Sequence, residues 1–169
     1  MSLSEKENLG QLDGAKPDAP LVWEKITAYC AYQDRCIMEV RGKLEDLGVE
    51  GDTITSLVEK LVEQGFVDEK RFVEAFVRGR FLIKKWGRVR IRQELKLRGI
   101  SEDLVREGIS WIEPDQYIEV LNSLADRKWQ ATKESDTFLK KGKVQRFLLF
   151  RGFEYDLVRE SLDRITTQF

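Results

Sequence analysis

The chain has 169 residues, of which 35% are charged and 41% hydrophobic, and its formal net charge at pH 7 is −1. This balance excludes a chain that is strongly basic or acidic throughout, and no run reaches the roughly 18 apolar residues of a membrane span. The chain has no histidine, no acidic cluster at ligand spacing and no phosphate-binding glycine loop. We therefore expect no metal site, no cofactor and no enzymatic activity.

Residues 1–20 are polar and contain Gly10, Gly14, Pro17 and Pro20. Such a segment cannot bury enough apolar surface to offset the entropy of ordering, so we predict a flexible tail. It lacks the basic and then apolar pattern of a signal peptide, which favours a cytoplasmic protein. Cys30 and Cys36 form no CxxC pair, and we interpret them as small buried residues in a reducing compartment.

After a predicted helix over residues 21–35, the chain begins an internal repeat. A shift of 51 residues and a further shift of 53 superpose apolar and glycine positions of the same type. The first copy is Val40, Leu44, Gly48, Val49, Ile54, Val58 and Leu61; the second is Ile91, Leu95, Gly99, Ile100, Val105, Ile109 and Ile112; the third is Val144, Leu148, Gly152, Phe153, Val158, Leu162 and Ile165. Periods of this size are typical of repeat architectures.

Each copy predicts two helices joined at its glycine. The first two apolar positions are spaced i, i+4, and a glycine followed by an apolar residue is the usual end of a helix, because the left-handed conformation there disfavours a Cβ. The last three positions are spaced i, i+4, i+7, as on the inner face of a second amphipathic helix. In the second copy, Ser101 is the predicted N-cap, followed by the acids Glu102 and Asp103.

A further helix precedes the second and third copies, over residues 68–84 and about 114–134. Asp68 is its predicted N-cap in the second copy, with Phe72 and Phe76 facing the core, and Pro114 fits the first turn in the third. The units are therefore residues 21–65, 66–112 and 113–169. They predict an all-α fold of three tandem three-helix repeats, stacked into an elongated, curved body. We interpret Trp23, Trp86, Trp111 and Trp129 as packing residues within and between the units.

Basic residues gather in the second and third units, where Glu94 is the one acid between positions 78 and 98. The candidate binding residues are Arg78, Arg80, Lys84, Lys85, Arg88, Arg90, Arg92, Lys96, Arg98, Lys141, Lys143, Arg146 and Arg151. Arg88, Arg92 and Lys96 are spaced i, i+4, i+8 and are predicted to line one outer face of a helix. Long basic side chains are also common on solvated helix faces, so the alternative is a surface without a partner.

Three segments resemble the successive modules of the RecX family. The central module is matched by FVDEKRFV at residues 66–73 and by WGxxxIxxELxxRGIS at residues 86–101, and the third by KVxRFLxxRGF at residues 143–153. The first is matched by RCxxEVxxKL at residues 35–44, although the family usually has a small residue after the arginine and leucine near Val40. The resemblance extends over about residues 21–165.

The resemblance implies a regulator of the RecA recombinase in homologous recombination, DNA repair and the SOS response. Such a protein binds the RecA–DNA filament, inhibits its ATP hydrolysis and strand exchange, and promotes its disassembly. We accordingly expect a monomer whose partner is the RecA filament, with weak contact to single- or double-stranded DNA and none to membranes. The basic surface would then meet acidic side chains or DNA phosphate.

Two alternatives from other classes stay open. The glycine between short helices also fits a helix-turn-helix DNA-binding module, in which the helix after the turn enters the major groove. That helix is mostly acidic in the second unit, with Glu102, Asp103 and Glu107 against Arg106, and it would be repelled by phosphate. The other alternative is a helical-repeat scaffold for an unrelated protein.

Overall fold

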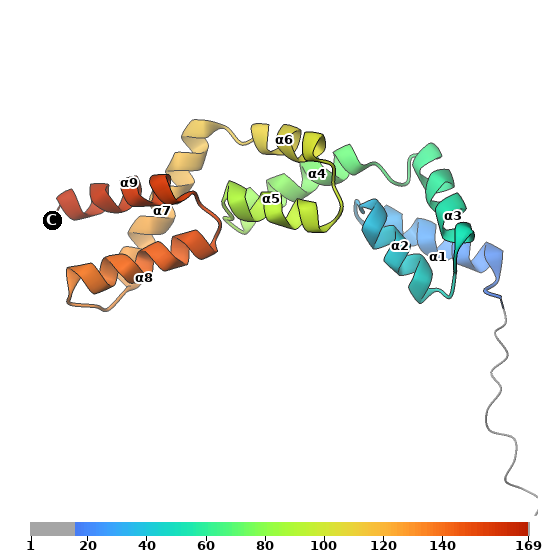
Figure 1. Cartoon of the computed structure of the whole chain (residues 1–169), viewed down its shortest axis with the longest axis horizontal. Helices are drawn as coiled ribbons and strands as arrows, with labels where there is room; N and C mark the ends of the chain where they lie inside the picture. Colours follow the sequence, from blue (N-terminus) through green and yellow to red (C-terminus); the bar gives the residue numbers. More distant parts are fainter. Residues whose placement is uncertain (1–15, 169) are drawn as a thin grey trace, which may run out of the picture.

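The computed structural model describes residues 16–168 of the chain. The segment 1–15 of the predicted tail lies outside them. The described part is helical and contains no strand, which confirms the all-α class. Three groups of three helices follow one another along the long axis of an elongated body (Figure 1). Within this part, none of the helices has the length and apolar character needed to span a membrane.

The first group comprises α1 (Ala19–Tyr32), α2 (Ile37–Asp46) and α3 (Asp52–Glu63). Cys36 is the N-cap of α2, where Glu39 closes a capping box by accepting a hydrogen bond from the Cys36 backbone N–H at 3.3 Å. Each helix buries one apolar face against the other two, because its apolar residues recur at helical spacing.

The second group comprises α4 (Glu69–Arg78), the π-helical turn η1 (Gly79–Ile83), α5 (Arg88–Leu97) and α6 (Glu102–Ser110). The predicted caps are confirmed. The Asp68 carboxylate accepts from the backbone N–H of Arg71 at 3.0 Å, and the Ser101 hydroxyl accepts from that of Leu104 at 3.4 Å. Both side chains satisfy donors that a helix leaves open in its first turn.

The third group comprises α7 (Pro114–Ala131), α8 (Thr137–Phe150) and α9 (Tyr155–Thr167). Pro114 begins α7, as predicted, because a proline at the first helical position loses no intrahelical hydrogen bond. Asp136 caps α8 through a hydrogen bond of 2.8 Å from the backbone N–H of Leu139.

The three repeat glycines end equivalent helices. Gly48, Gly99 and Gly152 follow α2, α5 and α8 with φ values of 82°, 72° and 91°. The apolar residue that follows each glycine donates its backbone N–H to a carbonyl group of the helix before it, as Ile100 does to Leu95 at 3.2 Å. The repeat read from the sequence therefore corresponds to one helix–turn–helix geometry built three times.

Buried apolar residues form two separate cores. The first core lies within α1–α3 and includes Ile26, Leu44 and Leu61. The second core is continuous through the second and third groups, and Cys36 is its single member from the first group among the described residues. Phe66 and Val67, just before α4, pack with the first core. The unit boundaries at residues 65/66 and 112/113 stay a proposal, and this packing favours keeping Phe66 and Val67 with the first unit.

The helix predicted over residues 68–84 differs from a regular α-helix at its end. The turn η1 widens to the π form, and Lys85 after it has φ 56°, the one positive value at a non-glycine position in the described part. A π turn adds a residue and so shifts the helical register. Phe81 at its centre is buried and lies 5.7 Å from the ring of Tyr117 in α7. The widened turn thus takes part in packing the third unit on the second.

Candidate functional site

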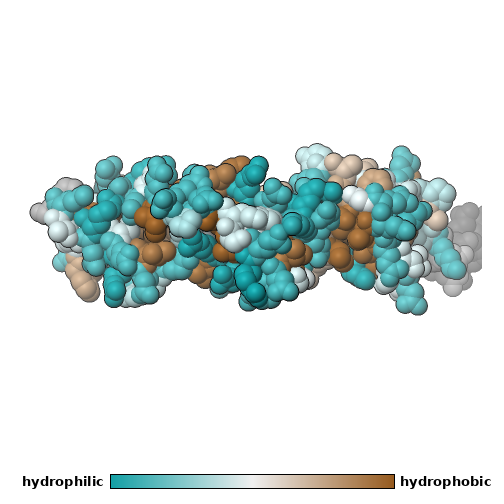
Figure 2. All heavy atoms as spheres, turned by 90° about the horizontal axis from the view of Figure 1, so that it is seen from above, coloured by the Kyte–Doolittle hydropathy of each residue, from teal (hydrophilic) through white to brown (hydrophobic). Residues whose placement is uncertain are grey.

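Hydrophilic side chains cover most of the face seen in Figure 2, with apolar atoms visible in separate patches between them. The face seen there has no broad apolar patch, and the predicted basic residues are the first candidates for binding. Their internal contacts decide which of them are available to a partner.

Three of the predicted bases lie where the third unit meets the second. The guanidinium of Arg88 stacks over the ring of Tyr117 at 3.9 Å and lies 3.6 Å from Glu154. That of Arg90 stacks on Trp86 of its own unit at 3.9 Å and lies 5.2 Å from the ring of Phe150 in the third unit, and Arg151 donates to the backbone carbonyl of Lys84 at 2.6 Å. These side chains hold two units together.

The prediction that Arg88 lies on an exposed outer face is wrong. Only 24% of its side chain is exposed, because it is covered by Tyr117 and Glu154 from the third unit. Arg92 and Lys96, on the same side of α5, are exposed, whereas Arg88 at the start of the helix is covered. Helical spacing predicted one stripe since it describes a helix alone, and the neighbouring unit covers one end of that stripe.

Arg98 occupies the corresponding place between the first and second units. Its guanidinium pairs with Glu94 at 2.7 Å on its own helix and lies 3.9 Å from Glu39 of α2. Arg98 and Arg151 are equivalent in the repeat, and each reaches toward the unit before its own. Leu47 stands at this position in the first unit, which has no preceding unit in the described part. Contact between units thus explains why this position is basic in the second and third units and apolar in the first.

Four more predicted bases form ion pairs, and one is packed on aromatic rings. The pairs are Arg78–Glu74 at 3.7 Å, Lys96–Glu102 at 2.9 Å, Lys141–Asp163 at 2.6 Å and Lys143–Glu134 at 2.8 Å. The paired lysines lower the pKa of the Glu102 and Glu134 carboxyls. Arg80 lies between Phe76 and Trp86, at 4.8 and 5.0 Å from their rings.

Four of the thirteen predicted residues remain without such a contact. We call Lys84, Lys85, Arg92 and Arg146 the free bases, because within residues 16–168 their side chains have no ion pair, hydrogen bond or aromatic ring. Lys84, Arg92 and Arg146 are exposed, and Lys85 is half-buried in the strained turn after η1. The thirteen residues are distributed over α4, η1, α5, α8 and the residues that follow these helices, and nine of them are held in internal contacts.

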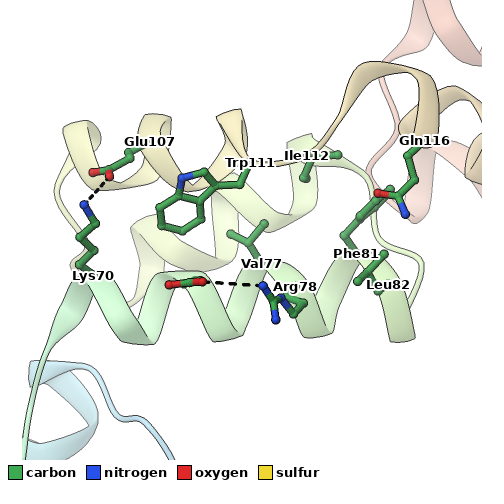
Figure 3. Close-up of a pocket in the computed structure, with 10 residues that line it drawn as sticks. Lys70, Val77, Arg78, Phe81, Leu82, Glu107, Trp111, Ile112 and Gln116 are labelled. Carbon is green, nitrogen blue, oxygen red and sulfur yellow. Dashed lines mark ion pairs between the residues drawn. The ribbon is translucent and has the colours of Figure 1, made fainter.

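Sequence reasoning missed a groove of about 610 Å³ between α4, η1 and α6 (Figure 3). Val77, Phe81 and Ile112 line it, and Trp111 stands at its side with 38% of its surface exposed. Trp111 therefore departs from the predicted role of a packing residue, whereas Trp23, Trp86 and Trp129 are partly buried against the two cores, as predicted.

A signal for this groove is present in the repeat. The positions equivalent to Trp111 are Lys60 in the first unit and Arg164 in the third, so a tryptophan stands where the other units have a basic side chain. Above the apolar floor, Lys70 pairs with Glu107 at 2.7 Å. The groove walls therefore carry charges that already neutralise each other.

The two cysteines are buried, as predicted, with exposed fractions of 5% for Cys30 and 0% for Cys36. Burial raises the pKa of both thiols, since it disfavours the thiolate. Among residues 16–168, no group of three or more potential metal ligands lies together. The interactions that recur on the surface of the described part are ion pairs and the stacking of basic side chains on aromatic rings.

Two family models match the chain in order. The model described as the second three-helix domain of RecX matches residues 68–109, and the one described as the third three-helix domain matches residues 115–162. These ranges contain α4, η1, α5 and most of α6, and most of α7–α9. The matches therefore follow the helical units that the structure displays.

Curated relatives carry the name "Regulatory protein RecX". One from Chromohalobacter salexigens is 32% identical over 132 residues, covering 78% of this chain and 84% of the relative. One from Prosthecochloris aestuarii is 29% identical over 143 residues, with coverages of 85% and 92%. One from Clostridium perfringens is 32% identical over 130 residues. This chain spans 60% of the length of that clostridial relative.

Solved structures show the same fold. A crystal structure of RecX from Lactobacillus salivarius aligns with a TM-score of 0.76 at 22% identity, covering 88% of this chain and 96% of that one. A second crystal structure of a regulatory protein RecX gives a TM-score of 0.77 at 22% identity, with coverages of 85% and 71%. The arrangement of three helical units along one axis is thus shared with experimental structures.

Proposed function

Because the chain belongs to the RecX family of regulatory proteins, we propose that it binds the RecA–DNA filament and slows its ATP hydrolysis and strand exchange. The observation that carries this proposal is the ordered match to the second and third RecX domains over residues 68–162. The elongated shape supports it, since consecutive units placed along one axis suit a ligand that is itself a linear array.

We propose the free bases as the contacts to the filament. Lys84, Lys85, Arg92 and Arg146 have no internal partner in the described part, so their charges are available to acidic side chains or DNA phosphate. The junction residues Arg88, Arg90, Arg98 and Arg151 would act differently. They hold the units in position, so a change at one of them would affect binding by altering how the units are arranged.

The direct test is the ATP hydrolysis of RecA from the same organism on single-stranded DNA, with increasing amounts of this protein. We expect the rate to fall as the protein approaches a fixed ratio to RecA, and strand exchange to fall in parallel. Raising the salt from about 50 to 200 mM should weaken the inhibition, because exposed charges are screened over about 10 Å at 0.1 M. An unchanged rate and unchanged strand exchange at excess protein would overturn the proposal.

A further inference from the structure

The third unit is fastened to the second by backbone hydrogen bonds. The N–H of Gly87 donates to the carbonyl of Arg151 at 2.8 Å, and the N–H of Val89 donates to that of Gly152 at 3.0 Å. The end of α8 thereby supplies carbonyl groups to the start of α5, where the first N–H groups of a helix lack internal acceptors. The opposite partial charges at these two helix ends favour the same contact. We call this contact the closed junction.

The closed junction depends on two glycines. A Cβ at Gly87 would lie 2.2 Å from the carbonyl oxygen of Gly152, and a Cβ at Gly152 would lie 2.3 Å from the Cβ of Arg90. Atoms at such separations overlap, so a side chain at either position would force the two helices apart. Backbone-to-backbone docking of these units is therefore possible only without a Cβ at both places.

The repeat places Cys36 and Gly99 at the equivalent positions between the first and second units. Cys36 carries a Cβ, and the first N–H groups of α2 are satisfied by side chains instead. Cys36 donates to Glu39 at 3.3 Å, and Ile37 donates to Glu69 at 3.2 Å. A Cβ at Gly99 would meet only Met38 Cε, at 3.7 Å. We call this contact the open junction.

Side-chain packing divides the chain at the same place. The second core runs without interruption across the closed junction, whereas Cys36 alone joins it from the first unit. Polar side chains make three further contacts there: Arg71 with Asp34 at 2.5 Å, Arg98 with Glu39 at 3.9 Å, and Glu69 with the N–H of Ile37. A groove of about 500 Å³ lies at this junction, with Met38 and Gly99 among its lining residues.

We propose that the first unit pivots as a body at the open junction, while the second and third units move together as one rigid body. Polar pairs that are partly open to solvent yield to competing water and salt, whereas a shared core and paired backbone groups resist separation. The pivot lets one chain present its first unit at different angles to whatever it binds. This inference concerns the free protein and does not depend on the proposed function.

The pivot is tested by two interspin distances in the full chain. Exposed sites on α3, α5 and α9 are converted to cysteine in pairs, Glu59→Cys with Gln93→Cys and Gln93→Cys with Arg159→Cys. Cys30 and Cys36 are buried, and the parent protein measures any background labelling. We expect the first pair to give a distance distribution at least about twice as broad as the second, and to broaden further with salt, which screens the polar pairs of the open junction. Equal widths for both pairs would overturn the proposal.

A single substitution should make the closed junction resemble the open one. Gly87→Ala introduces the Cβ that Cys36 already has, and it should broaden the Gln93–Arg159 distribution toward that of the first pair. Should this variant fail to fold, amide exchange in the parent protein decides the question. The N–H groups of Gly87 and Val89 should exchange at least about 10-fold more slowly than those of Cys36 and Ile37. Similar rates at all four positions would refute the rigid closed junction.

Discussion

The hydroxyl group of Tyr117 donates a hydrogen bond of 2.5 Å to the carboxylate of Glu154, within the third unit at its contact with the second. The same hydroxyl accepts from the backbone N–H of Arg88 at 3.0 Å. Tyr117 is fully buried, and burial together with the hydrogen bond to Glu154 raises the pKa of its phenol. One buried hydroxyl thus links the first turn of α5 to the start of α9.

Removing this hydroxyl should destabilise the protein. Tyr117→Phe keeps the ring but leaves the N–H of Arg88 and an oxygen of Glu154 without their partner. We expect the free energy of unfolding to fall by about 1–3 kcal/mol, measured by urea denaturation at pH 7. Tyr32→Phe is the matched control, because Tyr32 is 84% exposed and should change stability by less than about 0.5 kcal/mol. Equal effects of both variants would show that the buried hydroxyl contributes nothing.

The pH dependence of stability should also report on Tyr117. The pKa of Tyr117 is raised in the folded state. Its contribution to the free energy of unfolding is therefore complete below the unfolded pKa of about 10, and it is lost as the pH rises above that value. The difference in unfolding free energy between the parent and Tyr117→Phe should therefore shrink between about pH 9 and pH 11. A difference that stays constant or grows over this range would contradict the assigned direction of the shift.

Two equivalent glycines should tolerate a methyl group unequally. Gly99 and Gly152 both have positive φ, so alanine at either is strained by about 1–2 kcal/mol. At Gly99 the new Cβ finds space, whereas at Gly152 it overlaps Arg90. We expect Gly99→Ala to lower the unfolding free energy by about 1 kcal/mol and Gly152→Ala by about 3 kcal/mol or more. Chemical denaturation of both variants provides the comparison, and equal losses would argue against the close approach at Gly152.

Charge reversal at the free bases tests the proposed filament contacts. Arg92→Glu combined with Arg146→Glu should keep the helical content, because both side chains are exposed and glutamate is a good helix former. The variant should lose most of its inhibition of RecA ATP hydrolysis, since the surface would now repel an anionic partner. Lys25→Glu on α1 is the control, and it should inhibit like the parent. Full inhibition by the double variant at every salt concentration would place the contact elsewhere.

Arg88 is unsuitable for the same test. Glutamate at position 88 would face Glu154 at the closed junction and remove the stacking on Tyr117. A loss of activity would then reflect altered packing of two units. The double variant avoids this ambiguity, because neither Arg92 nor Arg146 contacts another unit through an ion pair or an aromatic ring in the described part.

The fold should protect the two cysteine thiols from chemical modification. Cys30 and Cys36 are buried with raised pKa values, so little reactive thiolate is present near neutral pH. We expect an aromatic disulfide reagent at pH 8 to modify both thiols at least about 100-fold more slowly in the native protein than in urea. Rapid native reaction of one thiol would show that its helix opens locally.

The sequence by itself determined the helices, most of their ends and their threefold recurrence, whereas it did not show the widened turn η1. These features depend on neighbours along the chain: apolar residues at i and i+4, a cap such as Asp68, and a glycine such as Gly99 where the backbone turns left-handed. The apolar spacing and the glycine are common to all three copies, although a side-chain cap such as Ser101 is not. For that reason the repeat could be found by sliding the chain along itself.

Only the tertiary structure decided which basic side chains remain available and how the units are joined. Arg88 and Arg92 look alike in the sequence, yet one is covered by the third unit and the other is exposed. Likewise, Gly87 and Cys36 occupy equivalent positions, but the contact of Gly87 with Gly152 spans 65 residues of chain. Burial and close approach depend on atoms brought together from distant segments, and no spacing within one helix records them.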